Sequence, residues 1–94
     1  MKHFSIAKYN DTVTDKDEMI KRIRALYEKA TEIPGVHGVS LLPCCIDRAN
    51  RYDLMIVLDM DREALSAWDE SDVHKTWKNE FGGYLAAKAI FDCE

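Results

Sequence analysis

The stretch that decides the fold is Tyr52-Asp53-Leu54-Met55-Ile56-Val57-Leu58-Asp59-Met60, the most apolar run in the chain. A short apolar run between polar turns is typical of a strand that is covered on both faces. One layer of helices covers only one face of a sheet. The simplest way to cover the other face is to pack a second copy of the chain against it, so this strand predicts a homodimer.

Three further strands and two helical segments surround this run and give a βαββαβ pattern. The other strands are expected at Lys2–Tyr9, at Val36–Leu42 and from Tyr84 or Leu85 to Cys93. We expect one antiparallel sheet with strand order 4-1-3-2, in which the start of the first strand lies beside the end of the last. The 94 residues are enough for one α+β domain, residues 1–94, with a small core.

The helical segments have recognisable start and stop signals. Thr14 is the expected N-cap of the first segment, and Pro34-Gly35 ends it. Its apolar positions keep a helical spacing, which predicts one face packed on the sheet: Ile20, Ile23, Leu26, Tyr27, Ala30 and Ile33. The second segment begins after Met60, is broken near Ser71, which can cap a new helical piece, and ends at Gly82-Gly83.

Composition excludes several classes of function. Hydrophobic residues make up 47% of the chain and charged residues 32%, which is typical of a soluble globular protein. The net charge of −4 argues against a nucleic-acid surface, which needs clustered Lys and Arg. No run approaches the roughly 18 apolar residues of a membrane span, and the start lacks a secretory signal. We therefore expect a cytoplasmic protein without a membrane or nucleic-acid partner.

The three cysteines do not predict a disulfide scaffold. Cys44 and Cys45 are adjacent, and Cys93 lies next to the C-terminus. Reduced, partly buried thiols in a loop are the favoured interpretation. A vicinal disulfide, or a metal site with His37, is the alternative. No CxxC or HExxH spacing is present, so no metal and no cofactor is expected.

Three reactive side chains stand out against the strand pattern. His3 opens the first strand and Asp92 closes the last, so the expected strand order brings them to one end of the sheet. His74 lies six residues after Trp68, at the second helical piece. A carboxylate bonded to one imidazole nitrogen leaves the other nitrogen free to abstract a proton. The alternative is that His74 is a satisfied interior histidine with Asp92 as its structural partner.

Small and aromatic residues predict a cavity beside these groups. Ser5 and Ala7 lie on the same side of the first strand as His3. Because both side chains are small, they would leave a space that aromatic side chains could line: Tyr9, Trp68, Trp77 and Phe81. An apolar cavity with a few polar groups is the usual form of a small-molecule site. The alternatives are that a partner subunit fills the space and that the two tryptophans belong to the core.

Several short motifs in a fixed order resemble one known family over essentially the whole chain. They are Lys2-His3-Phe4-Ser5-Ile6, Ile33-Pro34-Gly35-Val36, Tyr52-Asp53-Leu54-Met55, Leu65-x-x-Trp68 with Ser71-x-x-His74, and Ile90-Phe91-Asp92. The chain resembles the stress-responsive dimeric α/β-barrel domain proteins. The family's [His/Ser]-Pro-x-His motif lacks its proline here. The resemblance implies a ferredoxin-like fold that dimerises through its sheets into a barrel.

The resemblance also implies a site. In olivetolic acid cyclase, a cofactor-free polyketide cyclase of this family, the catalytic histidine and aspartate correspond to His74 and Asp92, and His3 matches another histidine of the site. Three pocket residues of that enzyme differ here and are replaced by Trp68, Leu54 and Ala25. Trp cannot supply a phenolic proton.

Two hypotheses for function follow. The first is a non-catalytic homodimer that binds a small hydrophobic or aromatic ligand. The second is a cofactor-independent, polyketide-cyclase-like enzyme in which His74 is the general base, Asp92 orients it and His3 polarises an oxygen. The lost phenol at Trp68 and the absence of a cofactor motif favour the first, and the three-residue constellation favours the second.

Overall fold

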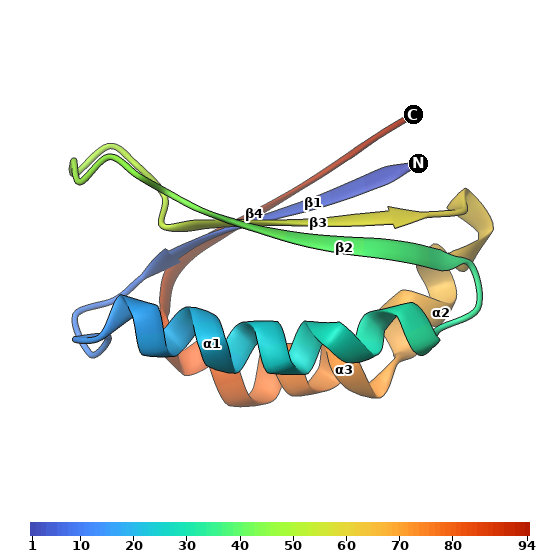
Figure 1. The fold of residues 1–94 in the computed structure, drawn as a ribbon, viewed down its shortest axis with the longest axis horizontal. Helices are drawn as coiled ribbons and strands as arrows, with labels where there is room; N and C mark the ends of the chain where they lie inside the picture. The colour runs from blue at the N-terminus through green and yellow to red at the C-terminus, as the bar shows by residue number, and fades with distance from the viewer.

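The computed structural model describes all 94 residues and has two layers, a four-stranded sheet and a layer of helices against one of its faces (Figure 1). The strands are β1 (Lys2–Tyr9), β2 (Val36–Pro43), β3 (Leu54–Met60) and β4 (Leu85–Cys93). The sheet order is β2-β3-β1-β4, and all neighbouring pairs are antiparallel. The predicted strand order and the α+β fold class are confirmed, although β3 begins two residues later than expected.

The first helix, α1 (Lys16–Tyr27), continues into a 3₁₀ segment at Glu28–Glu32. The prediction of Thr14 as its N-cap is wrong. Asp15 occupies that position, because its carboxylate accepts the backbone N–H of Glu18 at 3.0 Å. Met19, Ile23 and Tyr27 of the helix and Ala30 of the 3₁₀ segment are buried in the core.

The second helical region is broken, as predicted, at Ser71. A 3₁₀ turn (Arg62–Ala64) leads into α2 (Leu65–Glu70), and α3 (Asp72–Thr76) follows. The Ser71 hydroxyl accepts the backbone N–H of His74 at 3.2 Å and so caps α3. A π-helical turn (Trp77–Phe81) and a 3₁₀ turn (Gly82–Tyr84) then lead into β4.

Alternation along the central strands separates a covered from an uncovered face of the sheet. Every second residue of β1 is buried under the helices, and so is every second residue of β3: His3, Ser5, Ala7 and Tyr9, with Leu54, Ile56, Leu58 and Met60. This arrangement of β1 was predicted. The core therefore lies between the sheet and the helical layer, and the imidazole and hydroxyl of β1 lie within it.

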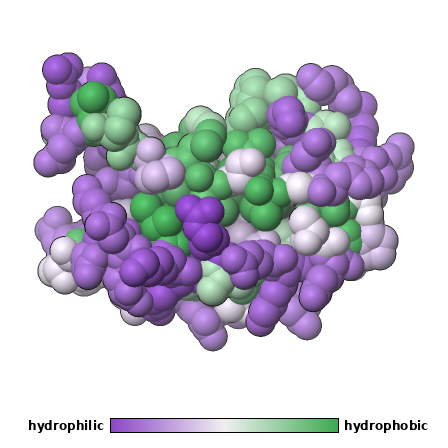
Figure 2. Space-filling view, in the orientation of Figure 1, coloured by the Kyte–Doolittle hydropathy of each residue, from purple (hydrophilic) through white to green (hydrophobic).

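The opposite side of the sheet, here called the open face, has no helix over it (Figure 1). Register places six large apolar side chains there: Phe4, Ile6, Leu42, Met55, Val57 and Phe91. Leu42 is 52% exposed and Phe91 61% exposed. Figure 2 shows this side hollowed between the β2–β3 loop and the strand ends, with hydrophobic atoms in the hollow. A contiguous apolar face of this kind is typical of an interaction surface.

Asp53 forms hydrogen bonds with three segments of the chain at one end of the sheet. Its carboxylate accepts the backbone N–H of Tyr9 at 2.7 Å and the ammonium of Lys16 at 2.9 Å. Its backbone carbonyl accepts the N–H of Cys44 at 2.9 Å. Partial burial raises the pKa of Asp53, but the hydrogen bonds from Lys16 and Tyr9 outweigh this effect, so the net pKa lies below its usual value.

We expect Asp53→Asn to destabilise the protein by about 1–3 kcal/mol at neutral pH, because hydrogen bonds to an ionised group are lost. The folded-state pKa is below the unfolded one, so this stabilisation is present above the unfolded pKa and disappears as the pH falls through the folded pKa. Urea unfolding of both proteins at pH 7 and at pH 3 measures it. A difference between the proteins that stays the same at both pH values would contradict the assignment.

Candidate functional site

The buried side of β1 places His3 directly opposite Asp92 on β4. Opposite residues on neighbouring antiparallel strands point to the same face of the sheet. Nδ1 of His3 lies 2.5 Å from Oδ1 of Asp92, and the His3 side chain is only 9% exposed. An ionised carboxylate only accepts, so Nδ1 donates and Nε2 carries the lone pair of the neutral ring. Asp92 therefore orients the His3 imidazole.

The prediction that His74 forms a hydrogen bond with Asp92 is wrong. Nδ1 of His74 lies 3.0 Å from the backbone carbonyl oxygen of Asp69. Carbonyls in the last turn of a helix lack intrahelical partners, and α2 ends at Glu70, so the His74 ring folds back to satisfy one of them. A carbonyl can only accept, so Nε2 of His74 is the free acceptor of the neutral ring.

Trp68 contacts both imidazoles. Its ring centroid is 6.4 Å from that of His3 and 5.2 Å from that of His74. The same indole packs 5.6 Å from Tyr27 of α1. Trp68 is only 2% exposed, so it belongs to the core, as one of the two interpretations of the sequence held.

The hydroxyl of Ser5 has no hydrogen-bond partner although the residue is only 4% exposed. Most buried polar groups are paired, so an unpaired one in a native protein calls for an explanation such as an absent water or ligand. Ser5 is two residues from His3 on the same face of β1 and lies opposite Ile90 on β4.

The helix-facing side of β4 is open to solvent next to these buried groups. We call Lys88, Ile90 and Asp92 the β4 shelf. Its members are exposed, whereas their partners on β1 are buried: Ala7, Ser5 and His3, respectively. Ile90 is 52% exposed. The shelf thus places an exposed apolar side chain beside an orphaned hydroxyl and an oriented imidazole.

The remaining predicted site residues lie elsewhere in the core. Ala7 is fully buried on β1, and Trp77 packs against Tyr27 and Phe81 with centroids 5.6 and 5.7 Å apart. Tyr9 borders a surface cavity at the other end of β1, and Phe81 borders a second cavity between α1 and α3. Of the predicted ligand-binding residues, the structure brings Ser5 and Trp68 next to His3.

The Tyr9 hydroxyl is a second buried polar group without a partner. Burial, and to a lesser extent the charge of Asp53, raises the pKa of Tyr9 to about 12. This phenol is therefore neutral throughout the physiological range. It lies at the opposite end of β1 from His3 and does not contribute to the His3 site.

Neither a metal cluster nor a membrane helix accompanies this site. No group of three or more His, Cys, Asp or Glu side chains is arranged to hold a metal ion. None of the helices has both the length and the apolar character that crossing a membrane requires.

Comparison with known proteins identifies the fold. No family model matches the chain, and no curated protein matches it. Among solved structures, a dimeric ferredoxin-like protein of unknown function from Thermobifida fusca superposes with a TM-score of 0.81 at 21% identity, covering 96% of this chain and 85% of that chain. An Arabidopsis thaliana protein gives 0.79 at 18% identity, covering 99% and 92%.

A DABB-family protein with a ferredoxin-like fold, from Mesorhizobium loti, superposes with a TM-score of 0.71 at 14% identity, covering 99% of this chain and 93% of that chain. This chain has a ferredoxin-like fold, like these three proteins. The resemblance predicted from the sequence is confirmed at the level of the fold. At these sequence identities, structural similarity does not indicate a shared activity. The specific comparison with olivetolic acid cyclase therefore gains no support from these structures.

Proposed function

We propose that this chain is a cytoplasmic homodimer that binds a small hydrophobic or aromatic molecule on the β4 shelf, without catalysis. The observation that carries the proposal is the pairing of His3 with Asp92 beside the unpartnered hydroxyl of Ser5. Small-molecule sites commonly combine apolar surface with a few fixed polar groups. His3 and Ser5 supply the polar groups, and Ile90 supplies the apolar surface.

The polar groups favour a ligand that carries a hydroxyl on an apolar or aromatic frame. Nε2 of His3 accepts from a ligand O–H, and the hydroxyl of Ser5 both donates and accepts. The ligand frame would lie on Ile90. A ligand oxygen that pairs with Ser5 removes the cost of a buried hydroxyl without a partner, which is about 1–3 kcal/mol.

The open face supports the homodimer. Its apolar side chains gather in the centre of the sheet, where Phe4 lies between Val57 and Phe91 in register. The rings of Phe4 and Phe91 lie with centroids 6.2 Å apart. The Thermobifida fusca protein of the same fold is described as dimeric. A second copy that packs sheet to sheet would remove these side chains from water.

Isothermal titration with a panel of aromatic hydroxy acids and polyketide-like acids tests ligand binding. We expect the wild type to bind members of the panel, and His3→Ala and Ser5→Ala to bind at least about tenfold more weakly, because one hydrogen bond is worth about 1.4 kcal/mol here. His37→Ala is the matched control, since His37 is exposed and pairs with Asp61. Equal affinity in His3→Ala and in His37→Ala would refute the proposed site.

A second candidate function is cofactor-independent general-base catalysis on an aromatic keto compound. The observation in its favour is that Asp92 holds Nδ1 of His3 and leaves Nε2 free as a base. In this candidate the base is His3 rather than His74, and Asp92 orients it. Turnover of a panel member would then fall about 10²–10⁴-fold in His3→Ala. Binding without turnover in the wild type leaves the non-catalytic proposal in place.

A further inference from the structure

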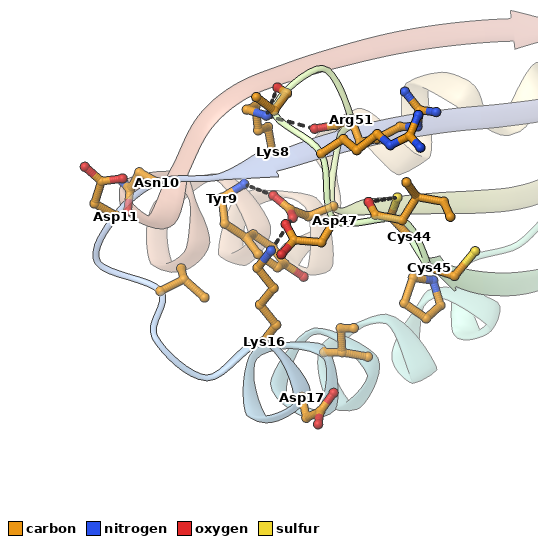
Figure 3. Close-up of a pocket in the computed structure, with 17 residues that line it drawn as sticks. Lys8, Tyr9, Asn10, Asp11, Lys16, Asp17, Cys44, Cys45, Asp47 and Arg51 are labelled. Carbon is orange, nitrogen blue, oxygen red and sulfur yellow. Dashed lines mark hydrogen bonds and ion pairs between the residues drawn. The ribbon is translucent and has the colours of Figure 1, made fainter.

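A surface cleft of about 900 Å³ lies at the opposite end of the sheet from His3. The end of β1, the start of α1 and the loop between β2 and β3 form its walls. Figure 3 shows Lys16 and Asp17 on the α1 side of this cleft and Cys44 and Cys45 on the loop side. The site proposed above uses none of these residues.

Cys44 and Cys45 are free thiols, and both are exposed. The prediction that they are partly buried is wrong, because the chain leaves the sheet after Pro43. A shared metal site with His37 is also excluded, since His37 lies near the other end of β2 and its Nε2 is 3.0 Å from Asp61. The third cysteine, Cys93, pairs with Lys2 at the far end of the sheet.

The loop that carries the two thiols is held at its ends. Cys44 donates its backbone N–H to Asp53 at 2.9 Å. At the other end, the ammonium of Lys8 donates to the backbone carbonyls of Ala49 and Arg51 at 3.0 and 2.8 Å. The Cys44 thiol contacts the carbonyl of Ile46 at 3.4 Å. The thiols therefore sit on an anchored loop with their sulfur atoms accessible from the cleft.

Adjacent cysteines are better suited to chelation than to a disulfide. Consecutive Cα atoms are about 3.8 Å apart, whereas the Cα atoms of ordinary disulfides are about 4.4–6.8 Å apart. A direct S–S bond between Cys44 and Cys45 would therefore be strained. A bridging atom between the two sulfurs spreads them apart and relaxes this strain, and soft thiolate ligands select soft centres.

Charges in the cleft favour an uncharged ligand. Four basic side chains line the cleft, and so do four carboxylates: Lys8, Lys16, Arg48 and Arg51, with Asp11, Asp17, Asp47 and Asp53. Lys16 and Asp53 pair with each other at 2.9 Å. Because opposite charges are equal in number, the cleft lining has no net charge that would attract an anion.

We propose that Cys44 and Cys45 form a dithiol site for uncharged, thiophilic trivalent arsenic compounds. Arsenous acid reacts with two thiols to give a cyclic dithioarsenite and two molecules of water: two As–O bonds break, two As–S bonds form, and each thiol proton leaves on a departing hydroxyl. Neither arsenic nor sulfur changes its oxidation state, so the reaction needs no oxidant. The two adjacent sulfurs close a ring around one arsenic atom.

Phenylarsine oxide tests the site, because it takes two thiols and releases one water. The reduced full-length protein is incubated with one equivalent, and the adduct is followed by intact mass and by titration of the remaining thiols. We expect one adduct in the wild type that consumes two thiols, resists excess 2-mercaptoethanol and is released by a dithiol such as dimercaptopropanol. Both single variants, Cys44→Ser and Cys45→Ser, should lose the adduct in 2-mercaptoethanol.

Cys93→Ser is the matched control and should keep the adduct. Far-ultraviolet circular dichroism establishes whether each variant is folded. We expect the Cys44 and Cys45 variants to fold, because both residues are exposed in a loop. Retention of the resistant adduct in either single variant of the pair, or its loss in Cys93→Ser, would overturn the proposal. A wild-type adduct that 2-mercaptoethanol removes would do the same, since it would indicate binding through a single thiol.

Discussion

Replacing Val57 by glutamate should convert the proposed homodimer into a folded monomer. Val57 lies on the open face next to Phe4 in register, in the most apolar strand of the sheet. An unpaired carboxylate buried between two sheets costs several kcal/mol, whereas the same carboxylate on the open face of a monomer stays hydrated. A loss of about 3 kcal/mol weakens association roughly a hundredfold. Sedimentation equilibrium at micromolar concentration measures the change.

Ser66→Glu is the control for this experiment, because Ser66 is exposed on α2 in the helical layer. This variant should sediment like the wild type. A wild type that is monomeric at micromolar concentration would contradict the dimer directly. A Val57→Glu protein that remains dimeric would show that the copies associate through another surface.

Trp68→Ala should cause the largest loss of stability among single substitutions in the helical layer. Trp68 is 2% exposed and packs against His3, Tyr27 and His74. Truncation of a buried tryptophan costs about 3–5 kcal/mol, while the total stability of a domain is about 5–15 kcal/mol. Urea unfolding followed by circular dichroism measures the difference. We expect Trp68→Phe to recover part of the stability, because it restores an aromatic ring.

Tyr52→Ala is the matched control for the truncation of an aromatic ring. Tyr52 is 38% exposed, so its loss should leave the free energy of unfolding within about 1 kcal/mol of the wild type. Equal effects of the two substitutions would mean that Trp68 is not part of the core.

The strand pattern could be predicted from the sequence because alternation and apolar content are local. The burial of His3, Ser5, Ala7 and Tyr9 follows from the period of two along β1. The apolar side chains on both faces of β3 predicted that one apolar face of the sheet has no helix over it. Met55 and Val57 lie on this face and are half-buried. The hydrogen-bond partner of Asp92 could also have been predicted, because the expected strand order places His3 beside Asp92.

The direction of the His74 ring could not be predicted in the same way. It depends on where α2 ends and on which backbone carbonyl is left free there, and Asp69 supplies that carbonyl. Helix ends vary by one or two residues for reasons that a sequence pattern does not resolve. The exposure of Cys44 and Cys45 likewise depends on the path of the loop after Pro43, for which no periodicity exists.

Long-range ¹H–¹⁵N correlation spectra of the three imidazoles test the His3 site most directly. Without ligand, the structure predicts that the neutral His3 ring is protonated at Nδ1, where it faces Asp92. The tightest binder of the aromatic acid panel should then shift the Nε2 resonance of His3 and leave that of His37 unchanged. A neutral His3 ring protonated at Nε2, or saturation with ligand that leaves both His3 nitrogens unshifted, would contradict the account.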